Sequence, residues 1–425
     1  MPRQTQQPRR DYKPLPWSNY FDEAIDVQTN STDSFRVYLS SFSKDELNAG
    51  DRPTLILLHG GGYSGLTWSL FTTHIKEYCH CRIMAIDQRG HGYTSTSNDN
   101  ELSIDNLVED VANVANKVHE MYGFEMLPPQ VIIGHSMGGA VAVKCASRCE
   151  DILRSLIGFV VIDVVEGTAI DALQGMQSVL NSRPTKFHSL TNAIEWSIRS
   201  GMTKNPEAAR VSMPGNLVNS ENRLAIYDVD KIIASEEPES FDEQPNQEFY
   251  MAPDKQQLAK RILNCPSLPP SRGTLPHPSI MSGRNIVEED EEEHEEKDLE
   301  RTIKSEHQLS GDNEHSFKRP ERQLTSTSTT GYTWRTNLMS TQPFWKGWFE
   351  GLSSQLLSAP VQGKLLLLAG IDRLDKELTI GQMQGKFMMR VLPKCGHAVH
   401  EDVPQQVADV VGNFLVRNKF AKSIC

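Results

Sequence analysis

Gly134-His135-Ser136-Met137-Gly138-Gly139 stands directly behind the apolar run Val131-Ile132-Ile133. A Gly-x-Ser-x-Gly pattern at the end of a buried strand predicts a sharp strand-to-helix turn with Ser136 at its apex. The flanking glycines are needed because a Cβ at either position would collide with the neighbouring strand or helix. Helix-forming residues follow at 140–144. The stretch therefore predicts an exposed serine nucleophile, with the backbone N–H of Met137 beside it as an oxyanion donor.

Continuous apolar runs recur on both sides of this turn, at 54–58, 82–86, 156–162, 364–369 and 387–392. Such runs are typical of strands that are buried on both faces of a parallel sheet. Helical patterns alternate with them, most clearly at 104–121, whereas residues 35–39 alternate as an outer strand would. The sequence therefore predicts an α/β-hydrolase fold, with a mainly parallel central sheet flanked by helices.

The composition divides the chain into four segments. We expect a mobile N-terminal tail over 1–16, a first core part over 17–213 that ends in lid helices from residue 170, and a second core part over 331–425. Between them, residues 214–330 are predicted to be a largely disordered acidic insertion. Residues 288–300 alone carry ten carboxylates and one lysine. They cannot bury enough apolar surface to offset the entropy lost on ordering.

The net charge is −12 over 425 residues, which argues against nucleic acid or an anionic membrane as the main partner. The seven cysteines are scattered and fit neither a disulfide framework nor a zinc site. The N-terminus is polar, and no apolar run is long enough to cross a membrane. We therefore expect no secretory signal and a location in the cytoplasm, the nucleus or both.

A second stretch bears on the same chemistry. His59-Gly60-Gly61-Gly62 follows the apolar run at 54–58. Successive glycines let backbone N–H groups approach a ligand, and this loop supplies the second oxyanion donor in many esterases. Gly61 and Gly62 are both candidates. The loop Asp87-Gln88-Arg89-Gly90-His91-Gly92 is interpreted as structural support near the site.

A serine nucleophile needs a histidine base and a carboxylate that orients it. In this fold the order along the chain is serine, acid, histidine. His397, in the loop after the last predicted strand, is the expected base, and His400 is the less favoured alternative. Spacing alone does not decide which carboxylate is the acid. Asp163 follows the predicted strand at 156–162, and Asp372 follows the one at 364–369.

These residues resemble the protein phosphatase methylesterase family. The resemblance is specific in Ile162-Asp163-Val164-Val165-Glu166-Gly167 and in Gly381-Gln382-Met383-Gln384-Gly385. It extends over 16–21, 58–62, 134–139, 193–197, 209–213, 332–335 and 365–402, which leaves out the N-terminal tail and the insertion. Tyr63 and Gly65 depart from the family pattern.

The resemblance implies a carboxyl-methylesterase that removes the methyl ester from the C-terminal leucine of the protein phosphatase 2A catalytic subunit. It also implies Asp163 as the acid, which leaves Asp372 a structural or phosphatase-binding role. Residues 211–213 match the segment that contacts the phosphatase in that family. The cleft of family members becomes productive when the phosphatase binds, and this binding can expel metal from the phosphatase.

The expected reaction is two-step acyl transfer by Ser136, Asp163 and His397, with Met137 and Gly61 or Gly62 as oxyanion donors. It requires no cofactor and no metal. Two other functions stay open. One is a broader hydrolase of small esters, and the other is a regulator that mainly binds inactive phosphatase.

Overall fold

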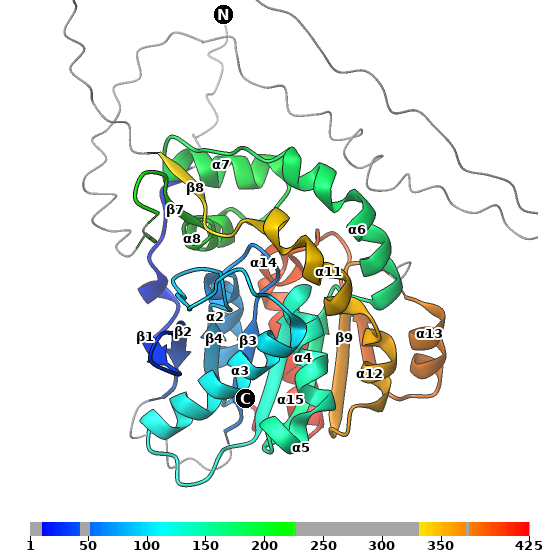
Figure 1. Ribbon diagram of the computed structural model, residues 1–425. Helices are drawn as coiled ribbons and strands as arrows, with labels where there is room; N and C mark the ends of the chain where they lie inside the picture. The colour runs from blue at the N-terminus through cyan, green and yellow to red at the C-terminus, as the bar shows by residue number, and fades with distance from the viewer. Residues whose placement is uncertain (1–10, 43–51, 224, 227–330, 371–373, 425) are drawn as a thin grey trace, which may run out of the picture. The chain divides into compact units, whose positions relative to one another are not determined.

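An eight-stranded sheet with the order β1-β2-β4-β3-β5-β6-β9-β10 forms the centre of the described part of the chain (Figure 1). The structure is a computed structural model, and it describes residues 11–42, 52–223, 225–226, 331–370 and 374–424. β1 and β2 pair antiparallel, as do β2 and β4, and the other neighbours pair parallel. The predicted α/β-hydrolase fold with a mainly parallel sheet is confirmed.

From β3 onward, the strands of this sheet coincide closely with the apolar runs of the sequence, whereas β1 and β2 do not. The strands are β1 (Glu23–Gln28), β2 (Ser34–Ser40), β3 (Thr54–Leu58), β4 (Arg82–Ile86), β5 (Gln130–His135), β6 (Leu156–Ile162), β9 (Gly363–Leu368) and β10 (Met388–Val391). Every residue of β3, β4 and β5 is buried, because helices cover both faces of the sheet.

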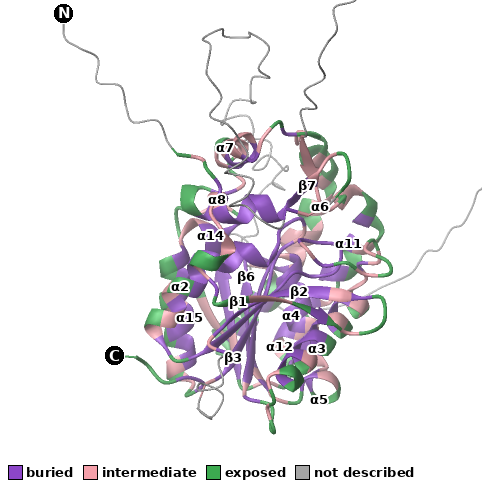
Figure 2. Cartoon of the chain, turned by 90° about the vertical axis from the view of Figure 1, so that its left-hand side faces the viewer, coloured by how far each residue is buried: buried purple, intermediate pink, exposed green. Residues whose placement is uncertain are grey.

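Two groups of helices cover the two faces of the sheet, and Figure 2 shows the buried strands between them. On one side lie α2 (Ser69–Tyr78) and α15 (Pro404–Arg417), which share a core cluster with the sheet. The other side is covered by α3 (Ile104–Met121), α4 (Met137–Ser147), α11 (Gln342–Phe349) and α12 (Leu352–Ser358). The short helices α5 (Cys149–Ile152), α13 (Lys376–Met383) and α14 (Val399–Asp402) complete the unit.

The edge of the sheet differs from the expectation. Residues 35–39 were expected to form an outer strand, but β2 lies between β1 and β4 and is almost entirely buried. The edge strand is β1, whose sequence Glu-Ala-Ile-Asp-Val-Gln carries charged side chains that are tolerated only beside solvent. Antiparallel pairing with β1 covers β2, which explains why an alternating pattern became a buried strand.

A layer of three helices follows β6, as predicted for residues 170–213. These are α6 (Glu166–Asn181), α7 (Leu190–Ser200) and α8 (Pro206–Gly215), and Figure 1 shows them together at the top of the view. An antiparallel pair, β7 (Leu217–Asn219) with β8 (Tyr332–Trp334), continues this layer.

Both predicted boundaries of the first core part need correction. Pro214 lies inside α8, and residues 216–223 and 225–226 are also described, so the predicted insertion starts too early; residues 227–330 lie outside the described part. Residues 11–16 were predicted to belong to the mobile tail. Instead, the Arg210 side chain donates to the carbonyl of Lys13 at 2.6 Å and to Asp11 at 2.9 Å, which fixes this segment on α8. Residues 1–10 are not described.

Within the described ranges, no helix is both long enough and apolar enough to cross a membrane.

Candidate active site

Ser136 stands at the apex of a strained turn between β5 and α4. Its φ of 52° lies in the left-handed region, which a non-glycine residue occupies only when its surroundings enforce it. The Ser136 N–H donates to the carbonyl of Ile162 at 3.0 Å, so β6 holds the turn. A Cβ on Gly134 would lie 2.0 Å from the Gly138 carbonyl oxygen, and one on Gly138 would lie 2.4 Å from that of Leu58. These contacts account for the two glycines that the motif requires.

Asp163 and His397, the predicted acid and base, lie in hydrogen-bond contact. His135 and Ile162 are register partners, so Ser136 and Asp163 follow neighbouring positions at the ends of β5 and β6. His397 Nδ1 lies 2.8 Å from Asp163 Oδ2, and the other carboxylate oxygen accepts the Ala369 N–H at 3.0 Å. Because the carboxylate accepts, Nδ1 carries the proton, which leaves His397 Nε2 free to take one. The Asp163 side chain is fully buried, whereas that of His397 is 49% exposed.

The contact between base and nucleophile is not made in this conformation. Among the described residues, no hydrogen bond joins the Ser136 hydroxyl to His397. The two are nevertheless tied together, because the His135 Nε2–H donates to the His397 carbonyl at 2.9 Å. Catalytic hydrogen bonds are often long without substrate and tighten in the complex. Asp372, the alternative acid, lies outside the described residues.

The oxyanion loop distinguishes between the two glycine candidates. The Gly62 N–H already donates to His91 Nε2 at 2.9 Å, with Gly62 at a φ of 81°. In the described part of the chain, the N–H groups of Gly61 and Met137 have no partner. A Cβ on Gly61 would lie 3.9 Å from the Met137 sulfur, so the two residues are neighbours. The geometry favours Gly61 as the donor and gives Gly62 a supporting role.

His91 must be neutral to accept that hydrogen bond. Its Nδ1–H donates to the Arg89 carbonyl at 2.8 Å, which leaves Nε2 as the acceptor. Burial lowers the pKa of His91 to about 4, so the ring is uncharged at neutral pH. The predicted support role of residues 87–92 is thus present at the oxyanion loop itself. Asp87 adds to it by accepting the N–H groups of Gly65 at 2.5 Å and Tyr93 at 2.9 Å.

Asp402 is a site residue that the sequence did not single out. One carboxylate oxygen accepts the N–H of Gly396, directly before His397, at 2.5 Å. The other accepts the N–H of Lys204, in the connection between α7 and α8, at 2.6 Å. Asp402 therefore joins the loop of the base to the helical layer above the sheet. No sequence signal marks this aspartate, because its partners are backbone groups from two distant segments.

The alternative base, His400, is fully buried beside the site. Its Nε2 lies 2.9 Å from the Thr67 hydroxyl, which also donates to Glu401 at 2.6 Å. Burial lowers the pKa of His400 to about 3 and raises that of Glu401 to about 7. A buried, uncharged imidazole that contacts no carboxylate is a structural histidine.

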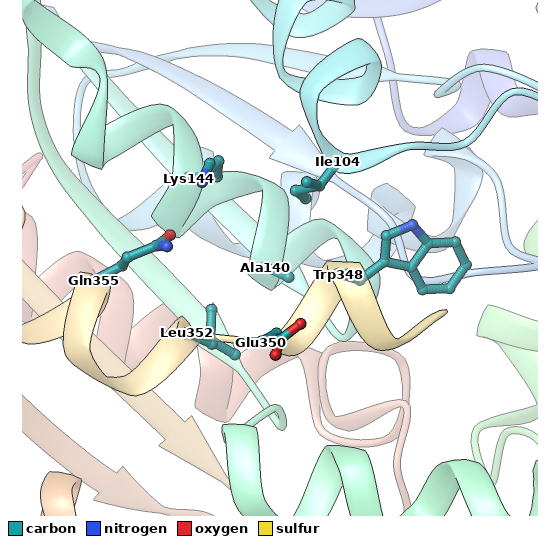
Figure 3. Close-up of a pocket in the computed structure, with 8 residues that line it drawn as sticks. Ile104, Ala140, Lys144, Trp348, Glu350, Leu352 and Gln355 are labelled. Carbon is teal, nitrogen blue, oxygen red and sulfur yellow. The ribbon is translucent and has the colours of Figure 1, made fainter. Parts of the chain in front are cut away.

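The described residues contain no group of three or more His, Cys, Asp or Glu side chains that could hold a metal ion. Figure 3 shows a hollow on the outer side of α4, lined by residues that include Ala140, Lys144, Trp348 and Glu350. Its volume of about 10 Å³ accommodates about one water molecule. Ser136 and His397 are not among its lining residues, so it is separate from the candidate active site.

Comparisons with known proteins identify the family of this chain. The chain matches the Alpha/beta hydrolase family over residues 55–215 and 250–410. It is 43% identical to protein phosphatase methylesterase 1 of Bos taurus, an alignment that covers 98% of this chain and 89% of the relative. It is 42% identical to the protein of that name from Homo sapiens, covering 98% and 88%. A probable protein phosphatase methylesterase 1 of Caenorhabditis elegans is 35% identical, covering 97% and 80%.

Solved structures show the same fold at low sequence identity. An E-2-(acetamidomethylene)succinate hydrolase superposes with a TM-score of 0.55 at 12% identity, covering 93% of this chain and 99% of that one. A peroxisomal α/β-hydrolase of Saccharomyces cerevisiae gives a TM-score of 0.51 at 10% identity, covering 94% and 88%.

Proposed function

This chain belongs to the α/β hydrolase family and, within it, to the protein phosphatase methylesterases, and from that premise we propose that Ser136, Asp163 and His397 perform its ester hydrolysis. The observation that carries the assignment of residues is the 2.8 Å contact between His397 and the buried Asp163 carboxylate, beside the strained Ser136 turn. The substrate of such an enzyme is a protein phosphatase. The specific substrate that we propose is the methylated C-terminal leucine of the protein phosphatase 2A catalytic subunit.

In the proposed reaction, His397 Nε2 takes the proton of the Ser136 hydroxyl, and the serine oxygen attacks the ester carbonyl. The negative charge that develops on the carbonyl oxygen is held by the N–H groups of Met137 and Gly61. The imidazolium of His397, stabilised by Asp163, gives its proton to the departing methanol. Water then attacks the acyl-enzyme by the same route and releases the free carboxylate.

We further propose that binding of the phosphatase completes the contact between Ser136 and His397. Two features of the free enzyme support this: the missing hydrogen bond between these residues and the half-exposed imidazole. Asp402 provides a route, because it connects the His397 loop to the α7–α8 connection, and a partner that moves this layer would act on the base.

The test is methanol release from purified methylated phosphatase catalytic subunit and from its methylated C-terminal peptide. We expect Ser136→Ala to reduce the rate on the order of 10⁴-fold or more, because the members of a triad act as a unit. Ser147→Ala, at the opposite end of α4, is the matched control and should retain activity.

Each alternative function has its own outcome in this assay. Faster release from the intact subunit than from the peptide supports completion of the site by the partner. Slow release from both, with ready cleavage of small esters, would identify a broader esterase. Tight phosphatase binding without any methanol release would identify a binding regulator. Near-normal turnover by Ser136→Ala would refute the assigned nucleophile.

A further inference from the structure

Arg183 places a positive charge next to the oxyanion loop. It lies two residues after the end of α6, and its Nη1 atom lies 3.8 Å from the position that a Cβ on Gly62 would occupy. Its guanidinium carbon lies 5.3 Å from the centre of the Trp334 ring. The charge therefore lies beside Gly62, the residue that follows Gly61, the favoured oxyanion donor. It does not belong to the groups that perform the proposed chemistry.

The segment that carries Arg183 is held in place by β8. The Trp334 Nε1–H donates to the carbonyl of Pro184 at 2.7 Å. The Thr333 hydroxyl donates to the carbonyl of Thr185 at 2.8 Å. Stacking on Trp334 leaves the edge of the guanidinium, where its N–H donors lie, available to a ligand. Arg183 is thus pre-organised, which lowers the entropic cost of binding.

Arg183 lacks the counterion that several arginines around it possess. Three arginines of this helical layer have carboxylate partners: Arg199 pairs with Glu195, Arg210 with Asp11 and Arg335 with Asp99. Arg223 instead donates to the carbonyls of Trp334 and Arg335. Within the described residues, no carboxylate pairs with Arg183. Burial lowers its pKa, and the Tyr63 phenol is the acidic group that lies near it. A partly desolvated and unpaired guanidinium favours an anion supplied by a ligand.

We propose that Arg183 binds an anionic side chain, a carboxylate or a phosphate, on a residue close to the C-terminal methyl ester of the substrate. This inference rests on the proposed function, since it requires a peptide ester in the site. The ester itself is uncharged, so the anion must come from a neighbouring residue of the peptide. The fork of guanidinium N–H groups matches the oxygens of either anion. Arg183 is then a specificity residue and takes no part in bond breaking.

The test uses short peptides that end in leucine methyl ester. Aspartate, phosphoserine or asparagine is placed in turn at each of the few positions before the leucine. Methanol release gives the ratio of kcat/KM for an acidic peptide over its asparagine counterpart. At the best position we expect a ratio of about tenfold or more in the full-length protein, as for one charge-assisted hydrogen bond. The aspartate and phosphoserine series show which anion is preferred.

Three variants of the same protein give the decisive comparison. Arg183→Gln should bring the ratio close to one, mainly through KM, and Arg183→Lys should retain part of the preference. Arg199→Gln removes an exposed arginine of the same layer and should keep the wild-type ratio. Thermal melting of all three variants verifies that they fold. An unchanged ratio in Arg183→Gln, or no preference for an acidic peptide in the wild-type protein, would overturn the proposal.

A second readout separates this inference from the proposed function. The same acidic and asparagine peptides, now ending in free leucine, are labelled with a fluorophore. Anisotropy gives the ratio of their affinities for the Ser136→Ala protein, with and without Arg183→Gln. If the peptide esters are not hydrolysed but the affinity ratio behaves as described, the proposed reaction fails and the anion site stands. If hydrolysis depends on Ser136 but neither ratio responds to Arg183, only the anion site is refuted.

Discussion

The clearest quantitative prediction concerns Asp402, which holds the loop of His397, the proposed catalytic base. Replacing it with asparagine leaves one acceptor oxygen for two backbone donors, the N–H groups of Gly396 and Lys204. The new amide NH₂ must then face one of these donors. A hydrogen bond to a charged acceptor contributes about 1.5–3 kcal/mol, so one of the two attachments is lost at about that cost.

We expect this loss to reduce kcat more than KM. Gly396 directly precedes His397, and a displacement of a catalytic group by 1 Å can cost about 100-fold in rate. The free-energy loss of about 1.5–3 kcal/mol corresponds to a decrease in kcat of about 10- to 100-fold. The Asp163–His397 contact does not involve Asp402, so the variant keeps its triad residues.

Hydrolysis of a chromogenic short-chain ester measures this effect without the phosphatase. Asp409→Asn, an exposed aspartate on α15, is the matched control and should behave as the wild type. Thermal melting of both variants tests whether the fold is intact. An Asp402→Asn protein with wild-type kcat, or one whose loss appears only in KM, would refute the claim that Asp402 positions the base.

Two further predictions concern stability. Gly138→Ala places a Cβ 2.4 Å from the Leu58 carbonyl oxygen, so it should lower the free energy of unfolding in urea by about 2 kcal/mol or more. Gly175→Ala, whose Cβ would have no atom within 4 Å, should be neutral or stabilising. Equal effects of the two variants would contradict the packing argument. Burial lowers the pKa of His119 to about 4, so its contribution to stability is present above about pH 6.5 and is lost toward pH 4. Between pH 7 and 5, the free energy of unfolding in urea should therefore fall by about 2 kcal/mol more in the wild type than in His119→Gln. Equal decreases in the two proteins would refute this assignment.

The sequence predicted the central strands well because burial on both faces leaves an unbroken apolar run. β3 and β4 coincide with the predicted runs, and α3 begins and ends at the predicted residues. The edge of the sheet was missed for the opposite reason. β1 carries charged side chains among its apolar ones, and its pairing with β2 makes it a strand.

The candidate site was predictable wherever one local turn determines it. Ser136 and Met137 belong to a single turn with its own steric signature. The choice between Gly61 and Gly62 depended on a hydrogen bond to His91, 29 residues away in the chain. Sequence spacing cannot reveal such a contact, nor can it reveal that one aspartate joins two backbone segments, as Asp402 does.

The parallel ladder between β6 and β9 has a consequence for the integrity of the polypeptide. Ser136 and Asp163 precede residues 227–330, and His397 follows them. The chain on either side of that segment is joined by β7 with β8 and by the pairing of Gly158–Ile162 with Gly363–Leu367. A single proteolytic cut between 227 and 330 would therefore produce two fragments that divide the proposed triad. The fragments would remain associated through backbone hydrogen bonds and the apolar clusters, and the active site would then depend on their non-covalent complementation.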